Sequence, residues 1–264
     1  MTFDARPASN LLWHAWQLGA VIGDLPVELR PTTREQGYAV QALLESRSSR
    51  SPAGWKIAAT SVAGQKHINV SGPMAGRILS ERVHPDGSML SLTDNRMRVA
   101  EVEFVFAMTQ SLEPRTDPYS LEEIMAAVGD LYLGIEVPDS RFARFHSAGE
   151  AQLIADNACA HVFVLGPRVM TPWREINLAA HPAHATVEGR ARRYERDGVG
   201  ANVLGDPRIA LTWLINELSA CGVTLAAGQF VTTGTCMVPL EIEAGDTVLA
   251  DFGAFGQVSC SFLS

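Results

Sequence analysis

The sequence lacks the features that mark several large classes of protein. Its 264 residues include 21 Lys and Arg against 29 Asp and Glu, so the formal net charge is −8 and there is no basic excess to bind a nucleic-acid duplex. Only 19% of the residues are charged and 47% are hydrophobic, which excludes an intrinsically disordered chain. The length is enough for one large domain or two small ones with a core of their own.

Signals for secretion and for membranes are also missing. The chain opens with Met-Thr-Phe-Asp, without a basic segment followed by an apolar one. The apolar stretch 11–22 is interrupted by His14 and Gln17 and is too short to span a bilayer. We therefore expect a cytoplasmic protein with neither membrane nor nucleic acid as a partner. No CxxC pair is present, and we interpret the four cysteines as reduced core thiols: Cys159, Cys221, Cys236 and Cys260.

The common catalytic and phosphate-binding motifs do not occur. The chain has no GxxxxGK[ST] loop, no GxGxxG after a strand, no HExxH and no GxSxG. Its seven histidines are scattered, and the pair in His181-Pro-Ala-His184 has no convincing metal-ligand spacing. We expect that pair to lie in an ordinary surface loop.

Helical patterns occupy the first part of the chain. Asn10 and Thr33 can each cap a helix there. Beyond residue 50 the texture changes to short apolar runs broken by Gly, Pro and Asp, as in the strands of an antiparallel or mixed sheet. The change predicts a helical N-terminal region, residues 1–50, packed on a β-rich domain, residues 51–264.

Two further helices and three strands have clear signals within the β-rich part. Ser120 and Glu123 form a capping-box pattern, and Asp206-Pro207 begins a helix that Gly222 ends. Strands are predicted near the C-terminus, at Phe230–Thr233, Thr247–Phe252 and Val258–Phe262. Strands cluster around a few helices instead of alternating with them, which favours an α+β fold.

The segment Ala100–Phe106 places two carboxylates side by side. Residues at i and i+2 of a strand share a face, so Glu101 and Glu103 project together while Val102, Phe104 and Phe106 share the opposite face. Two adjacent carboxylates repel each other unless a cation lies between them, and Mg²⁺, Mn²⁺ or Ca²⁺ would suit such oxygen ligands. The alternative is a solvated strand face with two exposed glutamates.

Two more ionisable residues stand alone in apolar runs. Glu136 lies in Leu131–Val137, where a single carboxylate is either a satisfied core group or a third ligand. Lys56 follows Gly54 and Trp55, and burial and a nearby metal would both lower its pKa. Lys56 could instead pair with a substrate anion, or extend past Trp55 to solvent.

Taken together in order, these segments resemble the fumarylacetoacetate hydrolase superfamily, and within it the family of 2-keto-4-pentenoate hydratases and 4-oxalocrotonate decarboxylases. The similarity covers essentially the whole chain, including the helical N-terminal region. The ordered motifs that carry it are Gly54-Trp-Lys-Ile, Glu101-Val-Glu, Gly134-Ile-Glu-Val-Pro-Asp-Ser-Arg, Ile154-Ala-Asp-Asn-Ala, Val203-Leu-Gly-Asp-Pro, Val231-Thr-Thr-Gly, Ala244-Gly-Asp and Phe255-Gly-Gln-Val-Ser.

The resemblance implies a mixed β-sandwich roll and a lyase. A divalent metal, Mg²⁺ or Mn²⁺, would be held by Glu101, Glu103 and Glu136 and would stabilise the dienolate of a 2-oxo or 2-hydroxy-dienoic acid. Water would then add to the conjugated double bond, giving a 4-hydroxy-2-oxo acid. It also implies a homo-oligomer and a place in the catabolism of aromatic compounds.

The resemblance assigns roles to three further residues. Lys56 is expected to orient or protonate the substrate, as a catalytic residue beside Glu101 and Glu103. Asp156 and Asn157 match a family signature near the site, and we assign them, with Lys56, to substrate binding; hydrogen bonding behind the site is their other possible role.

Two departures from the family pattern bear on the reaction. Hydratases carry an acidic residue where this chain has Pro73-Met74-Ala75-Gly76, and Met74 cannot transfer a proton. The decarboxylases are also apolar there, so loss of CO₂ from an oxalocrotonate-like 2-oxo diacid is the alternative reaction. A third reading is a catalytically degenerate member that binds a small acid. The family's Leu-Gly-His-Pro is Leu204-Gly-Asp-Pro207 here, where the Asp serves as a helix cap.

Overall fold

A computed structural model describes residues 3–190 and 192–263. In these residues the α-helices are α1 (Ala5–Gln17), α2 (Arg34–Ala42), α3 (Val62–Ile68), α4 (Leu121–Ala127), α5 (Phe145–Ala148), α6 (Glu150–Ala155) and α7 (Pro207–Ala220). Short 3₁₀ turns are η1 (Val27–Leu29), η2 (Glu45–Arg47), η3 (Ser80–Arg82), η4 (Asn157–Cys159), η5 (Leu178–Ala180), η6 (Gly200–Asn202) and η7 (Gly253–Phe255).

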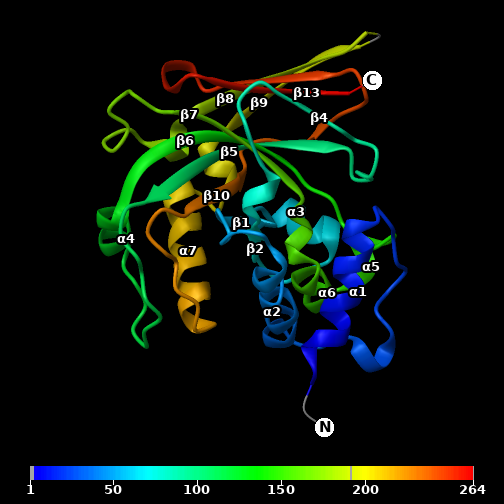
Figure 1. Ribbon diagram of the computed structural model, residues 1–264. Helices are drawn as coiled ribbons and strands as arrows, with labels where there is room; N and C mark the ends of the chain where they lie inside the picture. The colour runs from blue at the N-terminus through cyan, green and yellow to red at the C-terminus, as the bar shows by residue number, and fades with distance from the viewer. Residues whose placement is uncertain (1–2, 191, 264) are drawn as a thin grey trace.

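The strands form two sheets, and Figure 1 shows the smaller one lying across the curled larger one. The larger has the order β2-β1-β10-β5-β6-β7-β3, with β11 added beside β5: β1 (Gly54–Ala58), β2 (Met74–Ile78), β3 (Val83–Pro85), β5 (Val99–Met108), β6 (Val128–Val137), β7 (Val162–Arg168), β10 (Phe230–Thr235) and β11 (Leu240–Glu241). The smaller has the order β4-β13-β12-β8-β9: β4 (Ser88–Leu90), β8 (Pro182–Glu188), β9 (Arg193–Val199), β12 (Thr247–Asp251) and β13 (Gln257–Phe262).

The main core lies where the two sheets face each other. Phe104 of β5 meets Phe252, which directly follows β12, with ring centroids 5.1 Å apart in an edge-to-face arrangement. Val102, Phe104 and Phe106 are all fully buried, as their shared strand face predicts. The sequence-based expectation of an α+β fold with a mixed β-roll is confirmed.

Helix caps explain where most helices begin. Thr33 accepts a hydrogen bond from the backbone N–H of Gln36, and Ser120 with Glu123 forms the predicted capping box. Asp206 caps α7, as its position before a proline predicts. The prediction that Asn10 begins the first helix is wrong, because Asp4 caps α1 six residues earlier by accepting from the N–H of Arg6.

The region up to residue 50 packs against the rest of the chain through buried polar contacts. The Gln41 amide of α2 donates to the carbonyls of Ala75 and Ile154, both at 2.9 Å. The Trp16 indole of α1 donates to Nδ1 of His161 at 2.9 Å. The helices α1, α2, α5 and α6 gather on one side of the larger sheet (Figure 1). The division of the chain at residue 50 stays a sequence-based prediction.

The histidine pair expected in a surface loop lies elsewhere. His181 is 9% exposed and stacks on Phe255 with ring centroids 3.9 Å apart, while its Nε2 lies 2.8 Å from the carbonyl oxygen of Phe252. His184 lies on β8 and contacts Asp197 of β9 at 2.7 Å. The prediction failed because the proline of Pro182–Glu188 begins a strand, a position that proline tolerates. Of the four cysteines, Cys221 is exposed and the others are buried. No helix in the described part of the chain is long and apolar enough to cross a membrane.

Candidate active site

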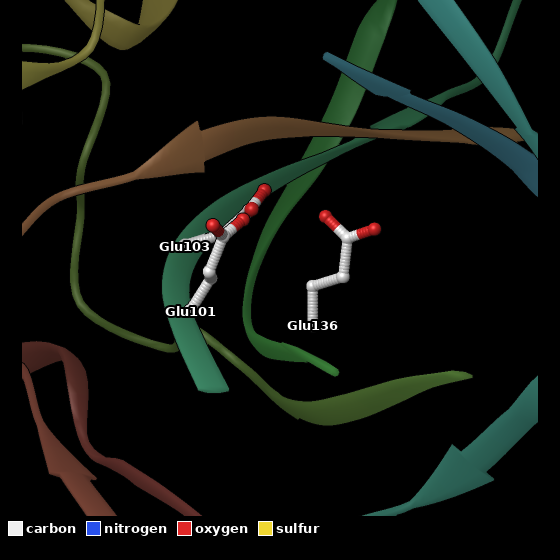
Figure 2. A group of neighbouring side chains, drawn as sticks. All are labelled: Glu101, Glu103 and Glu136. Atoms are coloured by element: carbon white, nitrogen blue, oxygen red, sulfur yellow. The ribbon is translucent and has the colours of Figure 1, made fainter. Parts of the chain in front are cut away.

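The strand β5 brings two carboxylates to the face opposite the main core. Glu101 and Glu103 project from this strand together, as Figure 2 shows. Glu103 is fully buried and Glu101 is only partly exposed, so a fully solvated strand face is excluded. The same face carries Val105, which packs against Phe163 and Phe230 in a small apolar cluster of its own.

The neighbouring strand β6 contributes the third carboxylate. The antiparallel register pairs Glu101 with Glu136 and Glu103 with Gly134. A Cβ atom at Gly134 would lie 2.3 Å from the Phe163 ring, so glycine leaves the room that this packing requires. One carboxylate oxygen from each of Glu101, Glu103 and Glu136 lies within 4.8 Å of the others. Cross-strand pairing thus converts two separate sequence motifs into one cluster.

Lys56 reaches the same cluster from β1. Its Nζ atom lies 3.1 Å from Oε1 of Glu136 and donates to the carbonyl oxygen of Ala158 at 3.0 Å. Because Lys56 is 2% exposed, its side chain does not extend past Trp55 to solvent. An ammonium group has three N–H donors, and these two acceptors occupy two of them.

The protein shifts the pKa values of all four ionisable groups. Burial raises the pKa of Glu101 to about 7; the charge of Glu136 adds to this effect and Lys56 opposes it. Burial also raises the pKa of Glu103 and Glu136. Burial alone would lower the pKa of Lys56, but the charges of Glu136 and Glu101 outweigh it, so its pKa lies above the usual value. The expectation of a lowered lysine pKa is therefore wrong for the protein without metal.

The oxygen atoms of the cluster fit a divalent cation. Oε2 of Glu103 accepts from the Thr232 hydroxyl and, at 2.8 Å, from the backbone N–H of Gly234. Oε1 of Glu103 and Oε2 of Glu136 are buried and have no hydrogen-bond partner among the described residues, which is costly unless something else binds them. When all three carboxylates are ionised, the one ammonium leaves two negative charges uncompensated, and carboxylate oxygens are the ligands that Mg²⁺, Mn²⁺ and Ca²⁺ prefer.

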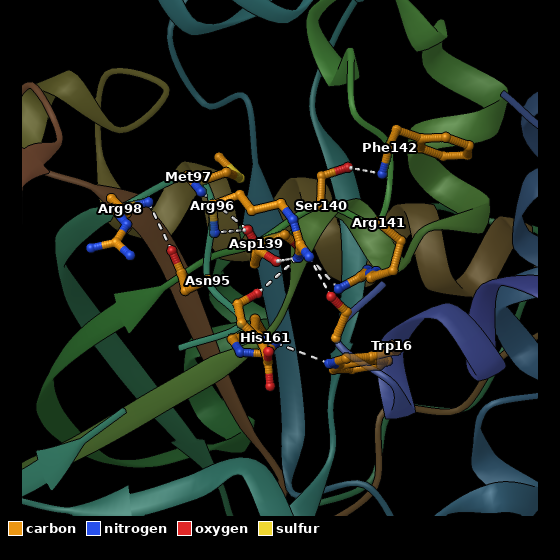
Figure 3. A network of polar contacts seen from close by, with 12 residues as sticks. Trp16, Asn95, Arg96, Met97, Arg98, Asp139, Ser140, Arg141, Phe142 and His161 are labelled. Carbon is orange, nitrogen blue, oxygen red and sulfur yellow. Dashed lines mark hydrogen bonds and ion pairs between the residues drawn. The ribbon is translucent and has the colours of Figure 1, made fainter. Parts of the chain in front are cut away.

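Asp156 lies in a buried ion pair with Arg141. Its carboxylate accepts from the Arg141 guanidinium, from the Arg141 backbone N–H at 3.0 Å and from the Ser140 hydroxyl at 2.7 Å. Figure 3 shows Arg141 and Ser140 in this network, with Arg141 above the ring of Trp16. Burial raises the pKa of Asp156, and the nearby Arg141 opposes that shift. Asp156 thus fixes the segment that follows β6.

Asn157 is engaged with the backbone of β2. Its Oδ1 accepts from the Arg77 N–H at 2.7 Å, and its Nδ2 donates to the Arg77 carbonyl at 2.8 Å. Neither Asp156 nor Asn157 belongs to the group of carboxylates that could hold a metal. That these two residues bind substrate stays a prediction.

Sequence reasoning assigned no role to several residues that shape the site. Thr232 and Gly234 orient Glu103 from β10, and Ala158 orients Lys56 through its carbonyl. Thr232 and Gly234 belong to the motif Val231-Thr-Thr-Gly, which was noted in the sequence. The Ala158 contact could not be found in this way, because a backbone carbonyl is present in every residue and gives no sequence signal. Met74 is fully buried and pairs with Ala58.

Comparison with known proteins identifies relatives along nearly the entire chain. No family model matches it. The chain is 30% identical over 255 residues to the 2-oxo-hept-4-ene-1,7-dioate hydratase of Escherichia coli, covering 94% of this chain and 92% of that protein. It is 26% identical over 260 residues to the 2-keto-4-pentenoate hydratase of Paraburkholderia xenovorans LB400, covering 97% and 94%.

A solved structure shares the fold. The 4-oxalocrotonate decarboxylase from Pseudomonas putida G7, complexed with magnesium and adipate, superposes with a TM-score of 0.84 and covers 99% of each chain. The sequence identity in this comparison is 24%, so the likeness concerns the fold alone.

Proposed function

The chain belongs to the family of 2-keto-4-pentenoate hydratases and 4-oxalocrotonate decarboxylases of the fumarylacetoacetate hydrolase superfamily, and from this premise we propose that it is a hydro-lyase. Its substrate is a small 2-oxo or 2-hydroxy-dienoic acid, and the product is a 4-hydroxy-2-oxo acid. The two hydratases compared above match over 94% and 97% of this chain.

Glu101, Glu103 and Glu136 are the proposed ligands of a divalent metal, Mg²⁺ or Mn²⁺. One observation carries the proposal: three carboxylates converge in a buried site, and two of their oxygens find no hydrogen-bond partner in the described part of the chain. When bound, the metal supplies a Lewis acid for the carboxylate and the C2 oxygen of the substrate. Thr232 and Gly234 hold one oxygen of Glu103 and leave the other directed at the cluster.

Lys56 is the proposed catalytic ammonium of the site. Its raised pKa keeps it protonated near neutral pH, and Glu136 and Ala158 hold two of its three N–H donors. The remaining N–H can donate to the substrate oxygen on which negative charge develops, or deliver a proton to the substrate carbon. The site is buried enough to strengthen such an interaction relative to water.

The experiment that tests this proposal uses the intact protein with Mg²⁺ and 2-hydroxypenta-2,4-dienoate. We expect the ultraviolet absorption of the conjugated diene to disappear and the product to gain the mass of one water. Omitting the metal with a chelator should stop the reaction. Unchanged absorption with every 2-hydroxydienoate tried would contradict the proposal, as would turnover that survives Glu103→Ala.

A second candidate reaction is decarboxylation of an oxalocrotonate-like 2-oxo diacid. Met74 favours it: this apolar side chain is fully buried and shares a strand face with Gly76, the register partner of Lys56. A side chain that cannot transfer a proton suits a reaction in which Lys56 alone serves as the proton donor. Release of CO₂ from 4-oxalocrotonate, with no hydrated product, would support decarboxylation over hydration.

A catalytically degenerate small-acid binder is the alternative to both reactions, and a homo-oligomer is a further prediction. The first requires that a 2-oxo acid binds in the presence of Mg²⁺ while none of the dienoates or diacids is converted. The second is checked by light scattering of the purified protein, where a mass close to 28.5 kDa would contradict it.

A further inference from the structure

The turn η4, which directly precedes β7, has an unusual backbone. Asn157, Ala158 and Cys159 all have positive φ angles, of 57°, 50° and 62°. Residues other than glycine seldom adopt this left-handed region, and three in succession are costly. Because all three residues are buried, the surrounding structure must hold the turn in place.

The Asn157 side chain provides that hold. It bonds both the N–H and the C=O of Arg77, so it occupies backbone groups of β2, which is the edge strand of the larger sheet. The backbone of the turn approaches β2 so closely that a Cβ atom at Gly76 would lie 2.5 Å from the Asn157 carbonyl oxygen and 3.0 Å from the Lys56 side chain. The turn, β2 and Lys56 are therefore packed as one unit.

The turn brings a backbone carbonyl within hydrogen-bond distance of the Lys56 ammonium group. The Ala158 carbonyl accepts from Lys56 Nζ at 3.0 Å, and Glu136 accepts at 3.1 Å. These two acceptors fix the direction of the third N–H of the ammonium group. If the Ala158 carbonyl turned away, as the ordinary φ of an alanine would require, Lys56 would keep only Glu136 as a partner.

We propose that Asn157 is a positioning residue: by clamping the left-handed turn to β2, it holds the Ala158 carbonyl on Lys56 and so aims the remaining Lys56 N–H at the substrate. This inference rests on the proposed function, in which Lys56 contacts the substrate. It gives Asn157 a role through Lys56 instead of a direct contact with substrate.

The test is a double-mutant cycle in the full-length protein loaded with Mg²⁺, with oxalate as a non-reacting probe of the site. Calorimetry gives the oxalate dissociation constant for the wild type, Lys56→Ala, Asn157→Ala and the double variant. Because Lys56→Ala removes a hydrogen bond between charged groups, we expect it to weaken oxalate binding by about tenfold or more. Asn157→Ala should weaken it severalfold, and the double variant should match Lys56→Ala alone.

A matched control is available on α7. Asn216 makes the same pair of bonds to one backbone residue, accepting from the Tyr119 N–H at 2.7 Å and donating to its carbonyl at 3.1 Å. The Asn216→Ala substitution removes a similar pair of side-chain-to-backbone bonds, but these do not involve the turn that contacts Lys56. It should therefore leave oxalate binding unchanged. Asn157→Gly guards against misfolding, because glycine adopts a φ of 57° without strain. A crystal structure of Asn157→Ala should show the Ala158 carbonyl moved from Lys56.

The outcomes separate this inference from the proposed function. Additive effects of Asn157→Ala and Lys56→Ala would overturn the inference and indicate that Asn157 touches the ligand itself. Unchanged oxalate binding in both Asn157 variants would also overturn it while leaving the metal site intact. If the wild type binds no Mg²⁺, the proposed function fails, and the structure of Asn157→Ala still decides whether Asn157 positions Lys56.

Discussion

The Nζ atom of Lys56 lies 3.1 Å from Oε1 of Glu136, and each of these two side chains is only 3% exposed. A buried charge that loses its partner is strongly destabilising, and each group of this pair favours the charged form of the other against the effect of burial. The pair occupies one oxygen of Glu136 and leaves the other without a partner. This one side-chain ion pair therefore supports the charge of the lysine and sets which oxygen of the glutamate is free to bind a metal.

Metal affinity should depend on pH near neutrality. The pKa of Glu101 is raised to about 7, so this group carries a proton below that pH in the metal-free protein. Binding a cation must displace the proton, and the apparent Mg²⁺ affinity should fall as the pH drops through about 7. Calorimetry in two buffers of different ionisation enthalpy measures both affinity and released protons. A flat affinity with no proton release would contradict the raised pKa.

The stability of the metal-free protein should decrease with rising pH. The ordinary pKa of Glu101 is 4.5 and the folded value is about 7, so between these values the folded state binds more protons than the unfolded state. The stability that Glu101 contributes is therefore fully present below about pH 4.5 and is lost as the pH rises through about 7. Thermal unfolding with a chelator should give a lower Tm at pH 8 than at pH 5.5, and Glu101→Gln should reduce the difference.

Glu103→Gln should separate metal binding from folding. The amide oxygen can still accept from Thr232 and Gly234, but one ligand charge is gone. We expect Mg²⁺ affinity to fall by at least the about tenfold to hundredfold that loss of a residue bonded to a ligand causes, and turnover to fall with it. Without metal, the variant should be more stable than the wild type, increasingly so as the pH rises, because glutamine removes a buried charge and its repulsion by Glu136 and Glu101. A Tm below that of the metal-free wild type would count against this account.

Gly76→Ala should damage both stability and activity. The added methyl group would lie 2.5 Å from the Asn157 carbonyl oxygen and 3.0 Å from the Lys56 side chain. Overpacking of this kind costs about 1–3 kcal/mol, measured by urea unfolding, and should lower kcat by displacing Lys56. Gly23→Ala is the control, since no atom lies within 4 Å of its new Cβ. Equal effects of the two substitutions would show that the close approach at Gly76 is unimportant.

Met74 should influence which reaction dominates. Met74→Asp places a proton-transfer group on the strand face of Gly76, the partner of Lys56. We expect the ratio of hydrated to decarboxylated product to rise by about a hundredfold, the lower end of what general acid–base catalysis contributes. Met74→Leu keeps the apolar volume and should leave the ratio unchanged. Product masses from 4-oxalocrotonate report both reactions, and an unaltered ratio in Met74→Asp would remove Met74 as the determinant.

Local patterns were sufficient for several helix starts and for the shared strand face of Glu101 and Glu103, whereas Glu136 was grouped with them by the family resemblance. The capping residues Thr33, Ser120 and Asp206 occupy the predicted positions, since a cap depends only on neighbours within a few residues. The first helix was misplaced because Asn10 and Asp4 are both competent caps, and local sequence does not rank them.

The sequence by itself determined that Glu101 and Glu103 share a strand face, because alternation along a strand is a property of consecutive residues. Only the tertiary structure decided that Glu136 stands opposite Glu101 and that Lys56 reaches Glu136, since strand register and sheet order join residues distant in the chain. It also decided how Asn157 and Ala158 act, because their hydrogen bonds depend on where the chain folds back on β2, which no local pattern encodes.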